Sequence, residues 1–100
     1  MSIVQLTEEF QGWLDELADR KAQVRIVARL RQAEGENLGD WAPVGGQVSK
    51  MRVHVGPGYR LYFTRRGGVL IIMLAGGDKS TQARDIRRAH RIAAELGDEP

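Results

Sequence analysis

Seven consecutive apolar residues, at positions 69–75, constrain the fold of this 100-residue chain more than any other feature. The run is far shorter than the roughly 20 residues that a membrane-spanning helix needs. Glycine pairs at 67–68 and 76–77 bound it on both sides. A short apolar run between turn signals is typical of a strand that is covered on both faces or lies centrally in a sheet. We therefore expect this strand to anchor a sheet, followed by a short loop at residues 76–79.

Two earlier segments alternate between apolar and polar side chains, as half-buried strands do. They span residues 48–55 and 59–64, and Gly56, Pro57 and Gly58 form a tight turn between them. A further short apolar stretch at Ile3 and Val4 is the expected first strand. The sequence thus predicts a mainly antiparallel sheet of about four strands.

Two helices are expected between the first strand and this hairpin. Thr7 is a favourable N-cap for the first helix, and Asp19 for the second. The first helix has an apolar stripe at i, i+3, i+4 and i+7, made by Phe10, Trp13, Leu14 and Leu17. Gly35 ends the second helix, and residues 35–46 read as loop with a short extended piece around Trp41.

A last helix is expected from a cap at Ser80 or Thr81 to about Leu96, before Gly97. The order strand, helix, helix, strand, strand, strand, helix predicts a single α+β domain over residues 1–100. The two N-terminal helices form a hairpin that covers one face of the sheet, and we expect the other face to stay open.

Charge is distributed unevenly along the chain. Residues 1–47 contain five basic and eight acidic side chains, whereas residues 48–91 contain ten basic and two acidic ones. Clustered lysines and arginines are the electrostatic signature of proteins that bind polyanions, although a merely solvated surface gives the same pattern.

Strand alternation places most candidate site residues on the expected open face. Arginine and lysine bind phosphate, while histidine and tyrosine can transfer protons near a bound substrate. The candidates on this face are Lys50, Arg52, His54, Arg60, Tyr62 and Thr64. Lys79, in the glycine loop, is expected to complete the site. In the last helix Arg84, Arg87 and Arg88 either contact nucleic acid or only solvate the surface.

The sequence implies neither a metal nor another cofactor. It contains no cysteine, and His54 and His90 stand without an HExxH spacing. Dinucleotide-binding and phosphate-loop glycine motifs are also absent from the sequence. The first ten residues lack the pattern of a secretory signal, so a cytoplasmic protein is expected.

The ordered set of motifs resembles the RelE/HigB-like toxins of bacterial type II toxin–antitoxin modules, in particular the phage-derived "addiction module killer protein" branch. The resemblance spans nearly the whole chain. It rests on the Phe10–Leu17 helical pattern, on the strand pair that carries Arg52 and residues 56–63, and on residues 76–82.

This resemblance implies a RelE-like fold and a metal-independent endoribonuclease that cleaves mRNA on or near the ribosome. It also implies a cognate antitoxin that neutralises the toxin in a hetero-oligomeric complex. The ribose 2′-hydroxyl would attack the adjacent phosphate, which Arg52 and Arg60 would bind, while Lys79 would support charge or proton transfer. Tyr62 and His54 are further candidates for proton transfer or base stacking.

The sequence departs from better-known members near its C-terminus. Those enzymes often place a catalytic Tyr or His there, whereas this chain offers only His90, in the middle of the expected helix. Either the proton-transfer groups have moved to the strand face and the Lys79 loop, or positioning and charge dominate. A ParE-like gyrase poison and a non-catalytic RNA-binding module are the alternative functions.

Overall fold

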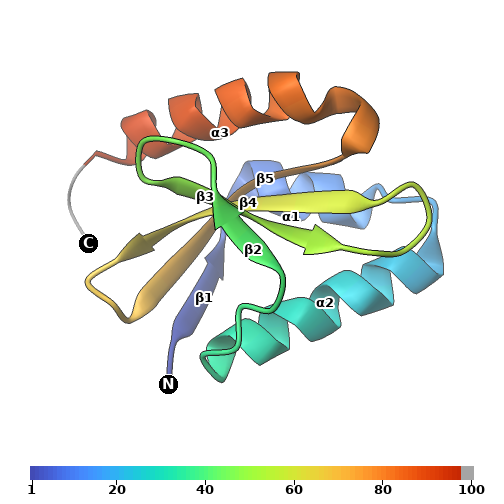
Figure 1. Cartoon of the computed structure of the whole chain (residues 1–100), viewed down its shortest axis with the longest axis horizontal. Helices are drawn as coiled ribbons and strands as arrows, with labels where there is room; N and C mark the ends of the chain where they lie inside the picture. Colours follow the sequence, from blue (N-terminus) through green and yellow to red (C-terminus); the bar gives the residue numbers. More distant parts are fainter. Residues whose placement is uncertain (98–100) are drawn as a thin grey trace.

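A computed structural model describes residues 1–97 of the chain, and it has the expected α+β architecture (Figure 1). Five strands form one sheet in the order β1-β5-β4-β3-β2. β1 pairs with β5 in parallel, and the other neighbouring pairs are antiparallel. The elements are β1 (Ile3–Leu6), α1 (Glu8–Asp15), α2 (Arg20–Glu34), β2 (Trp41–Pro43), β3 (Val48–Val53), β4 (Tyr59–Arg66), β5 (Leu70–Asp78), the 3-10 turn η1 (Lys79–Thr81) and α3 (Gln82–Leu96).

The expectation of about four strands is wrong by one, because the short extended piece around Trp41 is a true strand. β2 has three residues and pairs with β3 along one edge only, with Trp41 opposite Met51. Three residues are too few for alternation to reveal a strand in the sequence.

The N-terminal helical hairpin covers one face of the sheet, as predicted. Both predicted caps are present: the Phe10 amide donates to Thr7 Oγ1 at 3.1 Å, and the Ala22 amide donates to Asp19 Oδ1 at 3.1 Å. The core of this layer contains Phe10, Leu14, Ala22, Ile26, Leu30, Met51, Val53, Leu61, Phe63, Ile71 and Met73. No helix within residues 1–97 has both the length and the apolar character required to cross a membrane.

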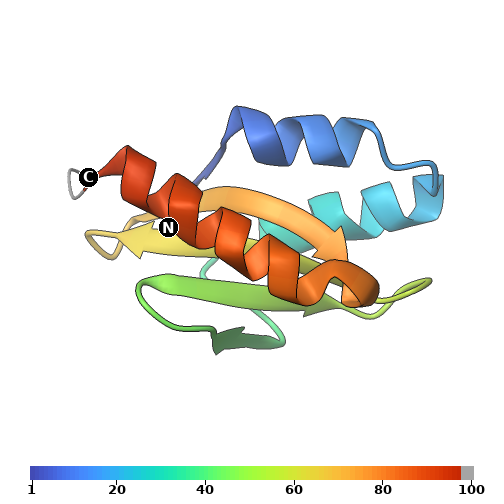
Figure 2. The same ribbon diagram turned by 90° about the horizontal axis from the view of Figure 1, so that it is seen from above.

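We expected the opposite face of the sheet to stay open, and this expectation is wrong. Figures 1 and 2 show α3 running across this face, while α1 and α2 lie on the other. Ala89 and Ile92 of α3 pack in one buried cluster with Val48, Tyr62 and Leu74 of the sheet. Val48 and Tyr62 belong to the alternating set that was expected to face solvent, and their apolar surface is what α3 covers.

The expected loop at residues 76–79 is also corrected, because β5 continues through Gly76 and Gly77 to Asp78. Both glycines are needed for close packing. A Cβ at Gly76 would lie 2.3 Å from the Trp13 ring, and a Cβ at Gly77 would lie 1.8 Å from Asp85 Oδ2. The two glycines therefore let α1 and α3 approach the strand from opposite faces.

The start of the last helix differs slightly from the prediction. Thr81 occupies the N-cap position of α3 as expected, but its hydroxyl donates to Asp85 Oδ2 at 2.6 Å instead of capping the helix. Asp78 caps the preceding turn η1, where its carboxylate accepts from the Ser80 amide at 2.8 Å. β3 ends at Val53, so His54 lies just beyond the strand in which it was expected.

We predict that Gly77→Ala lowers the free energy of unfolding by about 2–3 kcal/mol, because the added methyl group must displace the buried Asp85 carboxylate. Denaturant unfolding measures the change. Gly12→Ala is the matched control: nothing lies within 4 Å of its Cβ, and alanine should stabilise α1 by about 1 kcal/mol. Equal stability of the two variants would contradict the close-packing role.

Candidate functional site

The candidate site centres on two arginines that face each other across neighbouring strands. Arg52 of β3 is directly opposite Arg60 of β4. Lys50, two residues before Arg52 in the same strand, is opposite Tyr62. Like charges in directly opposite positions repel each other. Burial lowers the pKa of Lys50, and the nearby charges of Arg52 and Arg60 lower it further. The three cations therefore form one electrostatic unit, which we call the basic cluster.

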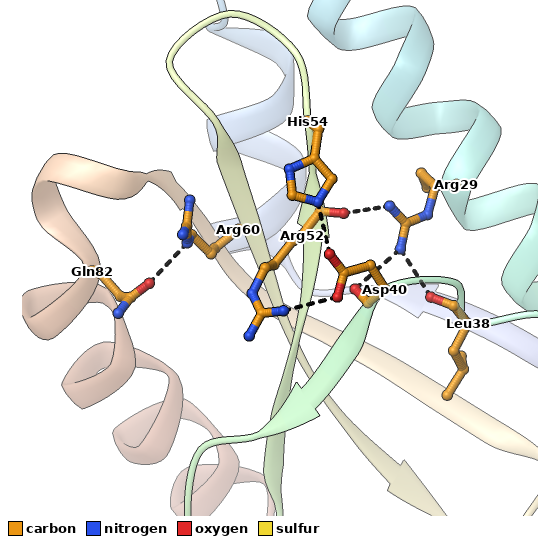
Figure 3. Close-up of polar contacts among 7 residues, drawn as sticks. All are labelled: Arg29, Leu38, Asp40, Arg52, His54, Arg60 and Gln82. Atoms are coloured by element: carbon orange, nitrogen blue, oxygen red, sulfur yellow. Dashed lines mark hydrogen bonds and ion pairs between the residues drawn. The ribbon is translucent and has the colours of Figure 1, made fainter.

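A carboxylate from the other half of the chain bridges two of the predicted site residues. Asp40, just before β2, accepts from Arg52 Nη1 through Oδ1 at 2.8 Å and from His54 Nε2 through Oδ2 at 2.7 Å (Figure 3). The hydrogen bond from His54 is the main reason that the pKa of Asp40 lies below its ordinary value, and the charge of Arg52 adds to the effect. Sequence reasoning expected no acid near Arg52 and missed this residue.

The bridge leaves hydrogen-bonding capacity free on both of its partners. A guanidinium has five N–H donors, and Asp40 occupies one Arg52 nitrogen. Because a carboxylate only accepts, His54 donates from Nε2, which leaves Nδ1 of the neutral ring as an acceptor. The His54 side chain is 71% exposed, so a substrate can reach that atom.

Arg29 of α2 fixes the position of Asp40 through the backbone. Its guanidinium donates to the carbonyl oxygens of Leu38 at 2.9 Å and Asp40 at 3.4 Å, and also to that of Arg52 (Figure 3). The Arg52 amide in turn donates to the Asp40 carbonyl at 2.8 Å. Burial lowers the pKa of Arg29, which remains a cation far above neutral pH. The segment that carries Asp40 is thus held against β3.

Arg60 has a neutral partner instead of an acid. Its Nε donates to Gln82 Oε1, at the start of α3, at 2.8 Å (Figure 3). No acidic side chain of residues 1–97 forms an ion pair with Lys50 or Arg60. The basic cluster therefore keeps a net positive charge, although Asp40 offsets Arg52.

Lys79 lies at the same end of the sheet as Arg60. Its amide donates to the Gly58 carbonyl at 3.0 Å, and the Arg60 guanidinium reaches the same carbonyl at 3.4 Å. The Lys79 side chain is exposed. The backbone of Lys79 thus lies beside Arg60, at the end of the basic cluster.

Two predicted site residues are buried under α3 and are out of a substrate's reach. Tyr62 and Thr64 have 0% and 1% of their surface exposed. Thr64 donates its hydroxyl to the Gln47 carbonyl at 2.7 Å, so it anchors the turn before β3. Burial and the charge of Asp85 raise the pKa of Tyr62 to about 12, so its phenol stays protonated. The roles expected for these two residues in catalysis and RNA binding are therefore corrected to structural ones.

The three predicted arginines of α3 have different surroundings. Arg88 pairs with the buried Asp85 at 3.4 Å and also with Glu9 of α1, so it joins two helices. Arg84 is 61% exposed and 3.5 Å from Asp85, and Arg87 is exposed. His90, the histidine nearest the C-terminus, donates from Nε2 to the Gly45 carbonyl at 2.9 Å and holds the turn between β2 and β3. Among these side chains, Arg84 and Arg87 are accessible to a ligand.

The structure gives no indication of a metal centre in the part of the chain that it describes. Within residues 1–97, no group of three or more His, Asp or Glu side chains is placed to hold a metal ion. The side chains that the structure gathers at the site are cations, one histidine and one bridging carboxylate.

We predict that Tyr62→Phe raises the free energy of unfolding by up to about 1 kcal/mol, because the buried phenol has no hydrogen-bond partner within residues 1–97. Thr64→Val is the contrasting variant and should lower it by about 1–2 kcal/mol, since it leaves the Gln47 carbonyl unpaired. Thermal or denaturant unfolding compares them. A destabilised Tyr62→Phe protein would reveal a hydrogen bond that the phenol needs.

We predict that the Asp40 carboxyl titrates below 3.8 in the folded protein and that His54→Ala moves its midpoint upward. A depressed folded-state pKa means that the Asp40 bridge stabilises the fold above the ordinary carboxyl pKa, and that this contribution is lost as the pH falls through the folded-state value. Carbon-detected NMR of the side-chain carboxyl measures the midpoint. His90→Ala removes a distant imidazole and should leave the midpoint unchanged; an equal shift in both variants would refute the bridge.

Comparison with known proteins identifies one relative by sequence. The chain is 40% identical over 94 residues to a protein of Haemophilus influenzae that bears the name "Uncharacterized protein". The match covers 94% of this chain and 95% of the relative. No family model matches the chain.

Proposed function

Because this chain belongs to the same family as the uncharacterized Haemophilus influenzae protein, whose name gives no activity, we propose its function from the site itself. We propose that it is a metal-independent endoribonuclease, the toxin of a type II toxin–antitoxin module with a RelE-like fold. It would act in the cytoplasm on mRNA, on or near the ribosome, and a cognate antitoxin would neutralise it.

The observation that carries this proposal is the directly opposed pair Arg52 and Arg60 with Lys50 beside them. A fold gains nothing from like charges held in opposite positions, so the arrangement favours an anionic ligand. Asp40 offsets one of these cations, and a phosphate on the remaining donors would offset the others. RNA supplies such phosphates at regular intervals along one strand.

The chemistry that this site could perform is attack by the ribose 2′-hydroxyl on the adjacent phosphate. His54 Nδ1 would take the proton of the hydroxyl, while Asp40 holds the ring through Nε2. O2′ bonds to phosphorus as the bond from phosphorus to O5′ breaks. Arg52 and Arg60 would stabilise the charge on the phosphoryl oxygens, and Lys79 would give a proton to O5′. The products are a 2′,3′-cyclic phosphate and a 5′-hydroxyl end.

The antitoxin is expected to act through the same charges. An acidic or extended segment that lies over Lys50, Arg52 and Arg60 would exclude RNA from the cluster. An antitoxin complex that leaves those side chains exposed would mean that inhibition works in another way.

We predict that induction of the protein alone arrests bacterial growth and produces cut messages with 5′-hydroxyl ends, and that Arg60→Ala abolishes both effects. Mapping of RNA 5′ ends after induction of the wild type and of Arg60→Ala measures the cleavage. Arg91→Ala removes an exposed arginine of α3 outside the proposed site and is the matched control, so it should behave as wild type. Purified protein should also cut a single-stranded RNA in EDTA, and a 2′-deoxy substitution at the cleavage position should block the cut.

Each other outcome points to a different function. Growth arrest with intact RNA and double-strand DNA breaks would indicate a gyrase poison. Steeply salt-dependent RNA binding without any product would indicate a non-catalytic RNA-binding module. Either result would refute the proposed cleavage.

A further inference from the structure

The outer face of α2 carries a second concentration of positive charge, away from the basic cluster. Among the five cations of this helix, Arg29 is turned toward Asp40 and β3, and the others are exposed. The exposed ones are Arg20, Lys21, Arg25 and Arg31. None of these four forms an ion pair with an acidic side chain of residues 1–97.

Two of these cations are placed where the helix itself disfavours them. Arg20 and Lys21 lie in the first turn of α2, which contains no acidic residue. The N-terminus of a helix carries partial positive charge, so cations in the first turn are unfavourable. Asp19, the N-cap residue, supplies a single carboxylate at this end of the helix, and an acidic partner would offset the remaining positive charge.

Exposed valines run between the cations. Val24 is 64% exposed and Val27 is 37% exposed, one turn apart on α2. Two shallow hollows adjoin Val24: one lies against Val55 of the turn between β3 and β4, and the other follows Val27 and Ala28. Arg20 lines both hollows. An apolar strip with a cationic rim therefore extends along the outer face of the helix.

From this combination we infer that the outer face of α2 is the docking site for an acidic amphipathic helix of a partner protein. Apolar side chains of the partner would cover Val24 and Val27, and its carboxylates would pair with Arg20, Lys21, Arg25 and Arg31. The strip offers no aromatic ring on which a nucleotide base would stack. It also lacks the bulky residues with which basic helices enter membranes, so a protein fits better than either RNA or lipid.

This surface is distinct from the basic cluster and does not depend on the proposed activity. α2 packs on the face of the sheet opposite α3, whereas the Arg60 side chain meets the start of α3 (Figures 1 and 3). The α2 surface ends next to the candidate site, because Val55, which lines one of its hollows, follows His54 directly in the chain. A helix docked along α2 would therefore end beside His54 without lying on the arginines.

The test uses the full chain and a labelled synthetic peptide as long as α2, with leucines on one helical face and glutamates on both flanks. A second peptide of the same composition has the leucines scattered around the helix. We expect fluorescence anisotropy to show that the first peptide binds at least about tenfold more tightly than the second. Arg20→Glu with Arg31→Glu should weaken its binding at least about tenfold, and so should Val24→Asp.

The matched control is Arg87→Glu with Arg91→Glu, the same change of charge on the exposed side of α3. It should leave peptide binding within about twofold. Equal binding of both peptides, or an equal loss in the control variant, would mean attraction by charge alone and would overturn the inference. So would a face that binds single-stranded RNA or phosphatidylglycerol vesicles through Arg20 and Arg31 while neither peptide binds.

Discussion

Burial of β5 on both faces is the constraint on which the rest of this structure depends. The strand pairs with β1 on one side and β4 on the other, so all its backbone groups between Leu70 and Met73 lie inside the sheet. Ile71 and Met73 face α1 and α2, whereas Ile72 and Leu74 face α3. An irregularity in the pairing with β4 then turns Ala75 toward α3 as well. Two helical layers follow, because each face of such a strand needs apolar cover.

The same strand decides where the site lies. The next two residues, Gly76 and Gly77, have no side chains. Trp13 packs against Gly76 on one face of the sheet, and Asp85 packs against Gly77 on the other. Asp85 brings the first turn of α3 down onto the sheet, which places Gln82 within reach of Arg60. A bulkier residue at position 77 would push this turn away. The packing of Asp85 against Gly77 of β5 therefore determines which residue Arg60 contacts.

The sequence predicted the elements that have strong local signals and failed where the decisive contact is distant. Thr7 and Asp19 cap helices as expected, since a cap is read from residues a few positions apart. The amphipathic pattern of α3 shows that the helix buries one face, but it does not say which surface that face covers. The sequence did contain one signal that this sheet face is covered: Val48 and Tyr62 are largely apolar side chains on a face whose other members are polar. Asp40 gave no local signal, because its role depends on a three-residue strand and on Arg29 of another element.

Charge along the chain is therefore a poor guide to charge in space. The acidic first half supplies partners to the basic second half: Glu9 pairs with Arg88, and Asp40 pairs with Arg52. These contacts remove two arginines from the apparent excess and leave Lys50 and Arg60 without an acid within residues 1–97. The four exposed cations of α2 also have no ion pair within residues 1–97, although they belong to a segment whose net charge is negative. The two basic surfaces differ in what accompanies the charge, a histidine held by a carboxylate in one and exposed valines in the other. That difference, more than the charge itself, is why we propose a reacting phosphate for the first surface and a protein helix for the second.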